Sequence, residues 1–93
     1  MSEKKDTQLI PTAKQETETE KREYYKKMME DVYSALKEKG YNPVSQIVGY
    51  MFSDDPTYIT AHNKARINVQ KLDRYELLQF MLEEYLGIQE PHE

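Results

Sequence analysis

The stretch that decides the fold is Ala35–Pro43, which reads Ala-Leu-Lys-Glu-Lys-Gly-Tyr-Asn-Pro. Gly40 suits the position after the last turn of a helix, because glycine adopts a left-handed backbone without a clash at Cβ. Asn42 caps the free N–H groups of a following helix, and Pro43 fits its first position, where no backbone donor is needed. The segment therefore predicts the end of one helix and the start of another.

The helix that ends before Gly40 is marked by apolar residues on one face, with the spacing i, i+3, i+4, i+7, i+11. They are Tyr25, Met28, Met29, Val32 and Leu36. We expect this helix to cover residues 18–39. Tyr41 follows the glycine in the place from which a side chain folds back on the last turn, here on Leu36.

The helix that begins at Pro43 is predicted to cover residues 43–52. Its apolar face consists of Val44, Ile47, Val48 and Met51. Gly49 interrupts this helix at a cost of about 1 kcal/mol relative to alanine. We interpret Gly49, like Gly40, Asn42 and Pro43, as a structural residue. At Gly49 the missing side chain is expected to permit close approach of another backbone.

Two further helices are expected, over residues 57–71 and 73–86. The first has a thin stripe of mostly small residues: Ala61, Ala65, Val69 and Leu72. The second begins with Asp73 and Glu76, which form a capping box, flanked by a hydrophobic staple between Leu72 and Leu77. Its apolar stripe is Leu77, Leu78, Met81, Leu82, Tyr85 and Leu86. The pattern predicts an all-α fold, a compact bundle of about four helices.

Composition excludes several classes of function. The chain has 93 residues, no cysteine and a net charge of −4. Disulfide frameworks, cysteine zinc sites and thiol nucleophiles are therefore excluded. No apolar run approaches the roughly 18 residues of a membrane span, and no apolar stretch near the N-terminus resembles a secretory signal. We expect a cytoplasmic protein without membrane insertion.

The sequence offers little for catalysis or for binding a cofactor. The histidines are His62 and His92, and His62 has only Arg66 as a polar neighbour at i+4. A surface histidine is the simpler interpretation. Gly-rich phosphate loops and nucleophile elbows are missing from the sequence. We expect no metal, no cofactor and no enzymatic activity.

The first 17 residues differ in composition from the rest. Residues 1–23 contain no aromatic side chain, and four of the chain's six threonines are Thr7, Thr12, Thr17 and Thr19. Such a segment buries too little apolar surface to offset its ordering entropy. We predict a flexible Thr-rich tail over 1–17, a helical dimerisation and regulatory domain over 18–87, and a frayed C-terminus over 88–93.

Eight tyrosines and four methionines indicate half-buried surfaces in the helical region. A short second helix and an alanine-lined third helix cannot shield all the apolar stripes of the first and the last. A homodimer in which two chains share one core is the economical solution.

Four basic residues gather between positions 64 and 74: Lys64, Arg66, Lys71 and Arg74. Lys64 and Lys71 are seven residues apart and would share a helix face. The cluster is either a solvated face or a site for phosphate, from nucleic acid or from a phosphorylated side chain. Nucleic acid is the weaker candidate because the total charge is negative and no base-reading helix is evident.

The middle of the chain resembles the IreB family of small regulatory phosphoproteins. The resemblance covers residues 32–86. It is carried by Ala35–Pro43, Gln46–Tyr50, Ser53, Asp55-Pro56, Tyr58-Ile59, Ala65-Arg66, Lys71, Arg74, Glu76-Leu77 and Tyr85-Leu86. It implies a helical homodimer without enzymatic activity. It also implies phosphorylation by a transmembrane Ser/Thr kinase with PASTA repeats, opposed by a PP2C-type phosphatase, and negative regulation of cephalosporin resistance during cell-wall stress.

The chain departs from the family in three places. Gln70 and Tyr75 replace residues that tend to be charged in the family. Ser53-Asp54-Asp55-Pro56 stands where the family has Ser-Gly-Asp-Pro, so the loop backbone is expected to differ. The family's N-terminal Asp-Glu-Thr segment is echoed only by Asp6-Thr7, whereas Thr12 is closer to the expected distance from the helices. Both Thr7 and Thr12 are therefore candidate phosphorylation sites.

The interpretation is a non-enzymatic regulatory phosphoprotein that acts on an unidentified downstream protein. Each phosphate adds about −1.5 to −2 charge, and we hypothesise that the phosphorylated tail docks on Arg66, Lys71 or Arg74. The alternatives are a small helical nucleic-acid-binding protein and a purely structural dimerisation module.

Overall fold

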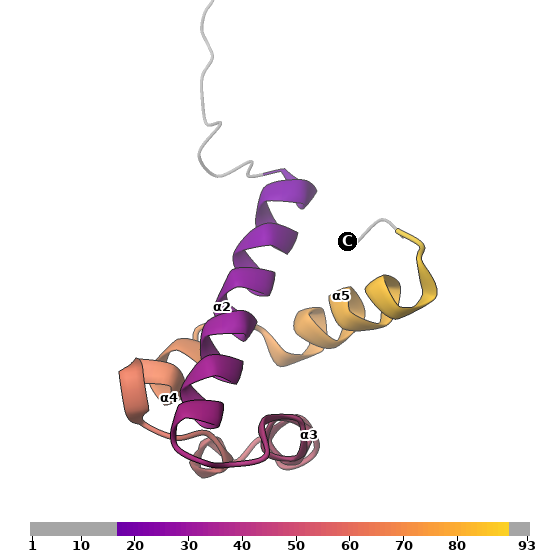
Figure 1. Ribbon diagram of the computed structural model, residues 1–93. Coiled ribbons are helices and arrows are strands. Elements are labelled where there is room, and N and C mark those ends of the chain that lie inside the picture. The colour runs from indigo at the N-terminus through magenta and orange to yellow at the C-terminus, as the bar shows by residue number, and fades with distance from the viewer. Residues whose placement is uncertain (1–16, 90–93) are drawn as a thin grey trace, which may run out of the picture.

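The computed structural model describes residues 17–89, and these fold as helices without a strand. The elements in chain order are α2 (Glu18–Glu38), α3 (Pro43–Ser53), the 3-10 turns η2 (Pro56–Tyr58) and η3 (His62–Lys64), α4 (Ala65–Val69) and α5 (Arg74–Leu86). In Figure 1, α4 lies beside the C-terminal half of α2, α3 crosses below it, and α5 extends outward from its middle. The predicted all-α class is confirmed.

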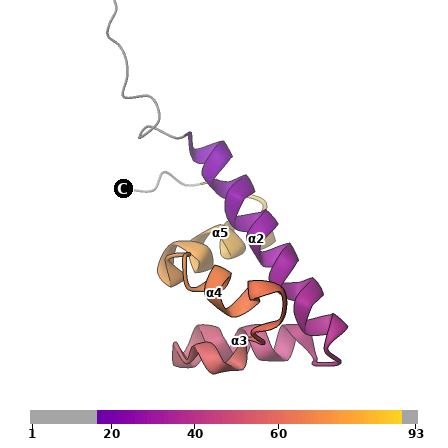
Figure 2. The same cartoon turned by 90° about the vertical axis from the view of Figure 1, so that its left-hand side faces the viewer.

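The junction between α2 and α3 has the predicted local structure. Gly40 has φ +83°. The N–H of Gly40 donates to the Lys37 carbonyl and that of Tyr41 to the Leu36 carbonyl, both at 3.0 Å, which is the paired bonding of a Schellman end. The Asn42 side chain then accepts from the Ser45 N–H at 3.0 Å. The turn in Figure 2 that swings α3 across the end of α2 is therefore fixed by local hydrogen bonds.

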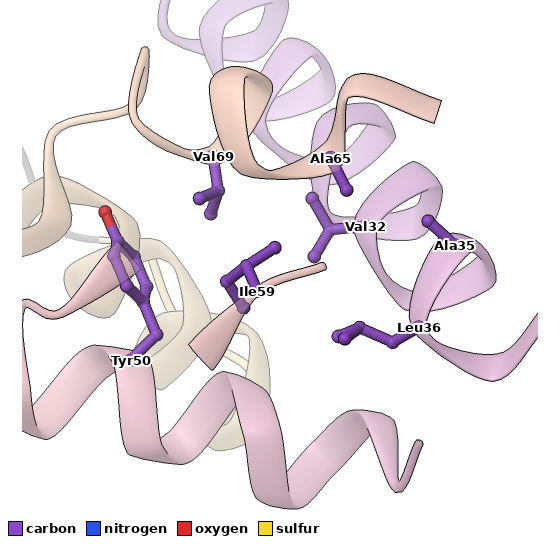
Figure 3. Packing of buried hydrophobic residues seen from close by; sticks show 7 residues of the cluster. All are labelled: Val32, Ala35, Leu36, Tyr50, Ile59, Ala65 and Val69. Carbon is purple, nitrogen blue, oxygen red and sulfur yellow. The ribbon is translucent and has the colours of Figure 1, made fainter. Parts of the chain in front are cut away.

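The main core joins α2, α3 and α4. It consists of Val32, Ala35, Leu36, Tyr50, Ile59, Ala65 and Val69. Figure 3 shows Ile59 between the α2 side chains and Tyr50. Leu36, Ile59, Val32 and Val69 are the largest fully buried side chains, and each contributes about 1.5–3 kcal/mol by leaving water.

A second, smaller cluster joins α2 to α5. Its buried members are Tyr25, Leu72, Leu77 and Phe80. The rings of Tyr25 and Phe80 meet edge to face with centroids 5.1 Å apart. Met29 and Met51 contact both clusters. The predicted staple pair, Leu72 and Leu77, is therefore buried as part of this cluster.

The helix expected over 57–71 is divided into the two 3-10 turns and the short helix α4. Ile59 is extended (φ −105°, ψ 128°), and Asn63 and Lys64 have positive φ. The cause is tertiary: Ile59 is fully buried in the main core, and its carbonyl accepts a hydrogen bond from Arg66 Nε at 2.8 Å. Burial of one side chain in an extended segment outweighs the weak helical propensity around it.

Two expected apolar faces are only partly buried. On α3, Ile47 and Met51 pack against the core, whereas Val44 and Val48 are exposed. On α5 only Leu77 of the predicted stripe is buried, and the buried aromatic is Phe80, which lay outside that stripe.

Gly49 permits a close approach, but to a side chain. A Cβ at this position would overlap the aromatic ring of Tyr58. The glycine therefore makes room for the ring that η2 places against α3, and the expectation of a backbone contact is corrected.

Candidate regulatory and interaction sites

Two of the three predicted phosphate-docking residues already hold backbone carbonyls. Arg66 binds the Ile59 carbonyl, as described above. Arg74 Nη1 donates to the Met51 carbonyl at 2.6 Å, and its Nε lies 3.2 Å from Asp54 Oδ1. These arginines brace η2 and α3 against α4 and α5. A phosphate would have to compete with those bonds or share the guanidinium groups.

Lys71, the third predicted residue, lies exposed beyond the end of α4. Among residues 17–89 it makes neither an ion pair nor a hydrogen bond through its side chain. Lys64 is the N-cap of α4, with a left-handed backbone. The expectation that Lys64 and Lys71 share one helix face is wrong, because α4 spans only five residues between them.

The loop after α3 is organised by its acidic and hydroxyl side chains. Ser53 Oγ donates to the Gly49 carbonyl at 2.7 Å and accepts from the Asp55 N–H at 3.0 Å. Asp55 Oδ1 accepts from the hydroxyl and N–H of Thr57 at 2.7 and 3.0 Å. These bonds hold the pKa of Asp55 below its usual range, with a smaller contribution from the positive charge of Arg66.

An open depression of about 410 Å³ lies between this loop and the start of α5. It is lined by Tyr50, Asp54, Pro56, Gln70, Leu72 and Arg74. Burial raises the pKa of the Tyr50 phenol, and the charge of Asp54 raises it further. Because the cation in this depression, Arg74, is already paired with Asp54, the geometry does not select a ligand.

The start of α5 is tied to α2 by a tyrosine hydroxyl. Tyr25 Oη donates to Glu76 Oε1 at 2.9 Å and accepts from the Asp73 N–H at 3.1 Å. Asp73 caps the Glu76 N–H as predicted, at 3.1 Å. The Tyr25 hydroxyl, rather than the Glu76 side chain, accepts from the Asp73 N–H. The predicted capping box is therefore only half formed. Burial raises the pKa of Tyr25 to about 12.

Two basic residues in the first turns of α2 reach α5. Lys21 Nζ lies 3.0 Å from Glu76 Oε2, and Arg22 Nη1 pairs with Glu83 Oε1. The Arg22 guanidinium also lies over the Phe80 ring, 4.7 Å from its centroid. Glu83 is only 6% exposed. The sequence analysis missed this pair, since no local pattern connects positions so far apart in the chain.

The described part of the chain begins at Thr17, which is the N-cap of α2. Its hydroxyl oxygen accepts from the Glu20 N–H at 3.0 Å, and Glu20 Oε1 accepts from the Thr17 N–H at 3.2 Å. This reciprocal capping box gives Thr17 a structural role. The phosphorylation candidates Thr7 and Thr12, with most of the predicted tail, lie outside the described residues, as do the last four residues of the chain.

The outward side of α5 is a large apolar surface, named here the α5 face. It consists of Tyr75, Leu78, Met81, Leu82, Tyr85 and Leu86, each exposed by two fifths or more. Leu77 and Phe80 are buried on the opposite side, so α5 carries apolar side chains on two sides. Its polar residues are Arg74, Glu76, Gln79, Glu83 and Glu84.

Residues 17–89 contain no group of three metal-ligating side chains placed to hold an ion. His62 instead pairs with Glu38, with 2.8 Å between Nε2 and Oε1, which is the surface role expected of it. No helix in the same part of the chain is long and apolar enough to cross a bilayer.

The fold and its surfaces define a class: a small all-helical protein that exposes an apolar helix face and carries its Thr-rich segment at one end of its longest helix. The family model of the IreB regulatory phosphoprotein matches residues 11–87. The chain therefore belongs to the IreB family of regulatory phosphoproteins.

Proposed function

We propose that this protein is a non-enzymatic, cytoplasmic substrate of a transmembrane Ser/Thr kinase, opposed by a PP2C-type phosphatase. In this role it acts as a negative regulator in cell-wall stress and cephalosporin-resistance signalling, through a downstream protein. Membership of a family of regulatory phosphoproteins carries the proposal. The sequence supports it, because four of the six threonines lie among the first 19 residues.

The kinase step is tested on the full chain by incubation with a PASTA-type kinase domain and mass mapping. Phosphate is expected on Thr7 or Thr12, and the double variant Thr7→Ala, Thr12→Ala should lose it. The matched control is Thr57→Ala, which alters a threonine already bonded to Asp55. A chain left unmodified by the kinase contradicts the proposal and favours the purely structural dimerisation module.

We propose further that two copies pair through the α5 face. A standard protein interface buries about 800 Å² on each partner, and six large side chains on one helix provide surface of that order. A second chain that covers these six side chains buries both sides of α5 and leaves the main core unchanged. The proposed dimer thus uses apolar area that one chain leaves in water.

Light scattering tests the dimer against the 11.1 kDa mass of one chain. Leu82→Ser should shift the equilibrium toward monomer by about tenfold or more, because it removes an apolar contact from the centre of the face. Glu84→Ser, an exposed polar position on the same helix, is the matched control. A monomeric wild-type chain at micromolar concentration would contradict this interface.

Lys71 is the best candidate for docking a phosphorylated tail. Leu72 packs with Tyr25, which lies about 12 Å along α2 from Thr17. The five residues from Thr12 to Thr17 span at most about 17 Å, and the ten from Thr7 about 34 Å. Both threonines therefore have enough chain to bring a phosphate to the level of Lys71.

Phosphorylation should then shift the amide resonances around Lys71, and Lys71→Ser should abolish that response while Lys39→Ser does not. No response anywhere in residues 64–74 would contradict docking and leave the kinase step standing. The nucleic-acid alternative is separated by a gel-shift titration at about 50 mM salt, where a basic binding face would retain duplex or single strands.

A further inference from the structure

Helix α3 is an uncharged helix on the surface of a highly charged protein. Its sequence, PVSQIVGYMFS, contains no ionisable side chain apart from Tyr50, which is buried, whereas 32% of the chain is charged. Three of its apolar residues point away from the core: Val44, Val48 and Phe52, exposed by 62%, 47% and 88%. Their spacing of four places them along one side of the helix. This set is named here the α3 stripe.

The two ends of the α3 stripe carry opposite charge. Lys39 is exposed just before α3, and Asp55 is exposed just after it. The hydrogen bonds from Thr57 that lower the pKa of Asp55 keep its carboxylate ionised. The neighbouring charges are already paired, Glu38 with His62 and Asp54 with Arg74. The helix dipole has the same sense, positive at the start of α3 and negative at its end.

The chain's own N-terminal segment is too short to cover the α3 stripe. The apolar pair in that segment is Leu9 and Ile10. Seven residues separate Ile10 from Thr17 and span at most about 25 Å. The helix α2 alone is about 30 Å long, and α3 begins beyond its far end, as Figure 1 shows.

The α3 stripe is also too small to hold a second copy by itself. Three side chains expose far less than the roughly 800 Å² that a stable interface needs on each partner, and the α5 face offers the larger surface. A stripe of three apolar side chains spaced by four residues does match the footprint of one amphipathic helix laid along it.

We propose that the α3 stripe is a docking site for a single amphipathic helix of a partner protein. That helix is about three turns long, apolar on its contacting side, acidic at the end that lies over Lys39 and basic at the end that lies over Asp55. Phe52, the most exposed of the three side chains, is the main anchor of the site. The proposal is independent of the kinase step and of the α5 face.

Two synthetic helical peptides of about 18 residues, long enough to form a helix in water, test this site. Both carry the same leucine stripe; one has a glutamate turn at one end and a lysine turn at the other, and the second has serines at both ends. Each is titrated into the full-length protein at about 50 mM salt and followed by amide resonances. The charged peptide should shift Val44, Val48 and Phe52 and bind several-fold more tightly than the serine peptide.

Variants separate this site from the α5 face. Phe52→Ser should weaken the charged peptide about tenfold, whereas Leu82→Ser should leave its affinity unchanged; both side chains are exposed, so neither change opens a cavity. The inference is overturned if the peptide shifts α5 resonances instead, if it binds nowhere, or if Phe52→Ser binds it as the wild type does. Resonances of the α3 stripe that change when the protein is diluted to monomer would assign the stripe to a second copy and would equally overturn it.

Discussion

The two halves of the molecule are held together in different ways. Where α2 meets α3 and α4, the contact is a dry core of seven buried residues. Where α2 meets α5, there are four buried residues, one of which is Tyr25. The Tyr25 hydroxyl, Lys21 and Arg22 also bind the cap and the glutamates of α5. The first half buries its contact with side chains from three helices and Ile59. In the second, α5 leaves six large apolar side chains exposed.

The largest loss of stability is expected in the core that joins α2 to α3 and α4. Leu36→Ala removes a fully buried side chain from the main core and should lower the free energy of unfolding by about 2–5 kcal/mol. Leu82→Ala, on the α5 face, should change the stability of the monomer by less than about 0.5 kcal/mol. Urea unfolding of both variants below the dimer concentration measures the contrast. Equal losses at the two positions would erase the distinction between the halves.

The ion pair of Arg22 and Glu83 should give the next largest loss. Glu83→Ala removes the buried carboxylate beside the Phe80 ring and leaves Arg22 with only the more exposed Glu18, 3.5 Å away. Removal of one partner of a buried pair costs about 3 kcal/mol. The pair of changes Arg22→Leu, Glu83→Leu should recover most of that loss, because both charges are then removed. Denaturant midpoints of the single and double variants measure the coupling. A double variant as unstable as Glu83→Ala would show that the pair matters for reasons other than its charges.

Tyr25→Phe should cost about 1–2 kcal/mol, since it deletes two hydrogen bonds and leaves the Asp73 N–H without its acceptor. Tyr24→Phe, next to it but exposed, is the matched control and should be nearly neutral. The variant also distinguishes the two halves of the molecule, because only the α5 half depends on this hydroxyl. Protease sensitivity should therefore rise in α5 before it rises in α3 or α4.

The same hydroxyl predicts a loss of stability in alkali. Tyrosine in the unfolded chain ionises near pH 10, whereas burial raises the pKa of Tyr25 to about 12. Below pH 10 the phenol is neutral in both states, and its contribution is complete. Between pH 10 and 12 only the folded state keeps the proton, so stability falls as pH rises through this window. Ultraviolet titration should show a tyrosine ionising near pH 12, and Tyr25→Phe should remove that step while the raised pKa of Tyr50 remains.

The sequence predicted the elements whose signals are local. The end at Gly40, the caps at Asn42 and Asp73 and the staple of Leu72 and Leu77 each depend on residues within a few positions of one another. The α5 face was anticipated only as apolar area too large for one chain to cover. Which side of α5 is buried, with Phe80, and which side faces outward depends on where α2 lies. No pattern within the sequence of α5 indicates that position.

The rest depended on contacts between distant positions. The helix over 57–71 was wrong because Ile59 fills the core in an extended conformation, and Arg66 binds its carbonyl. Arg22 and Glu83 looked like ordinary solvated charges in the sequence, since only the packing of α5 on α2 brings them together. Residues with long polar side chains were therefore the hardest to assign from sequence alone.

The smallest effect concerns the loop after α3, where Asp54 pairs with Arg74 at the start of α5. Asp54 has φ +59°, a backbone that costs a non-glycine residue about 1 kcal/mol, so the family's glycine fits the same conformation and the expected change of loop backbone is not needed. Asp54→Gly relieves this strain but loses the pair with Arg74, an exposed contact contributing about 0–1 kcal/mol. The two terms nearly cancel, and we expect stability to rise by less than about 1 kcal/mol. Asp54→Ala keeps the strain and loses the pair, so it should be the less stable of the two in thermal unfolding. If Asp54→Ala matched Asp54→Gly, the left-handed conformation would not be the reason for glycine at this position, and Arg74 would hold the start of α5 to α3 through the Met51 carbonyl alone.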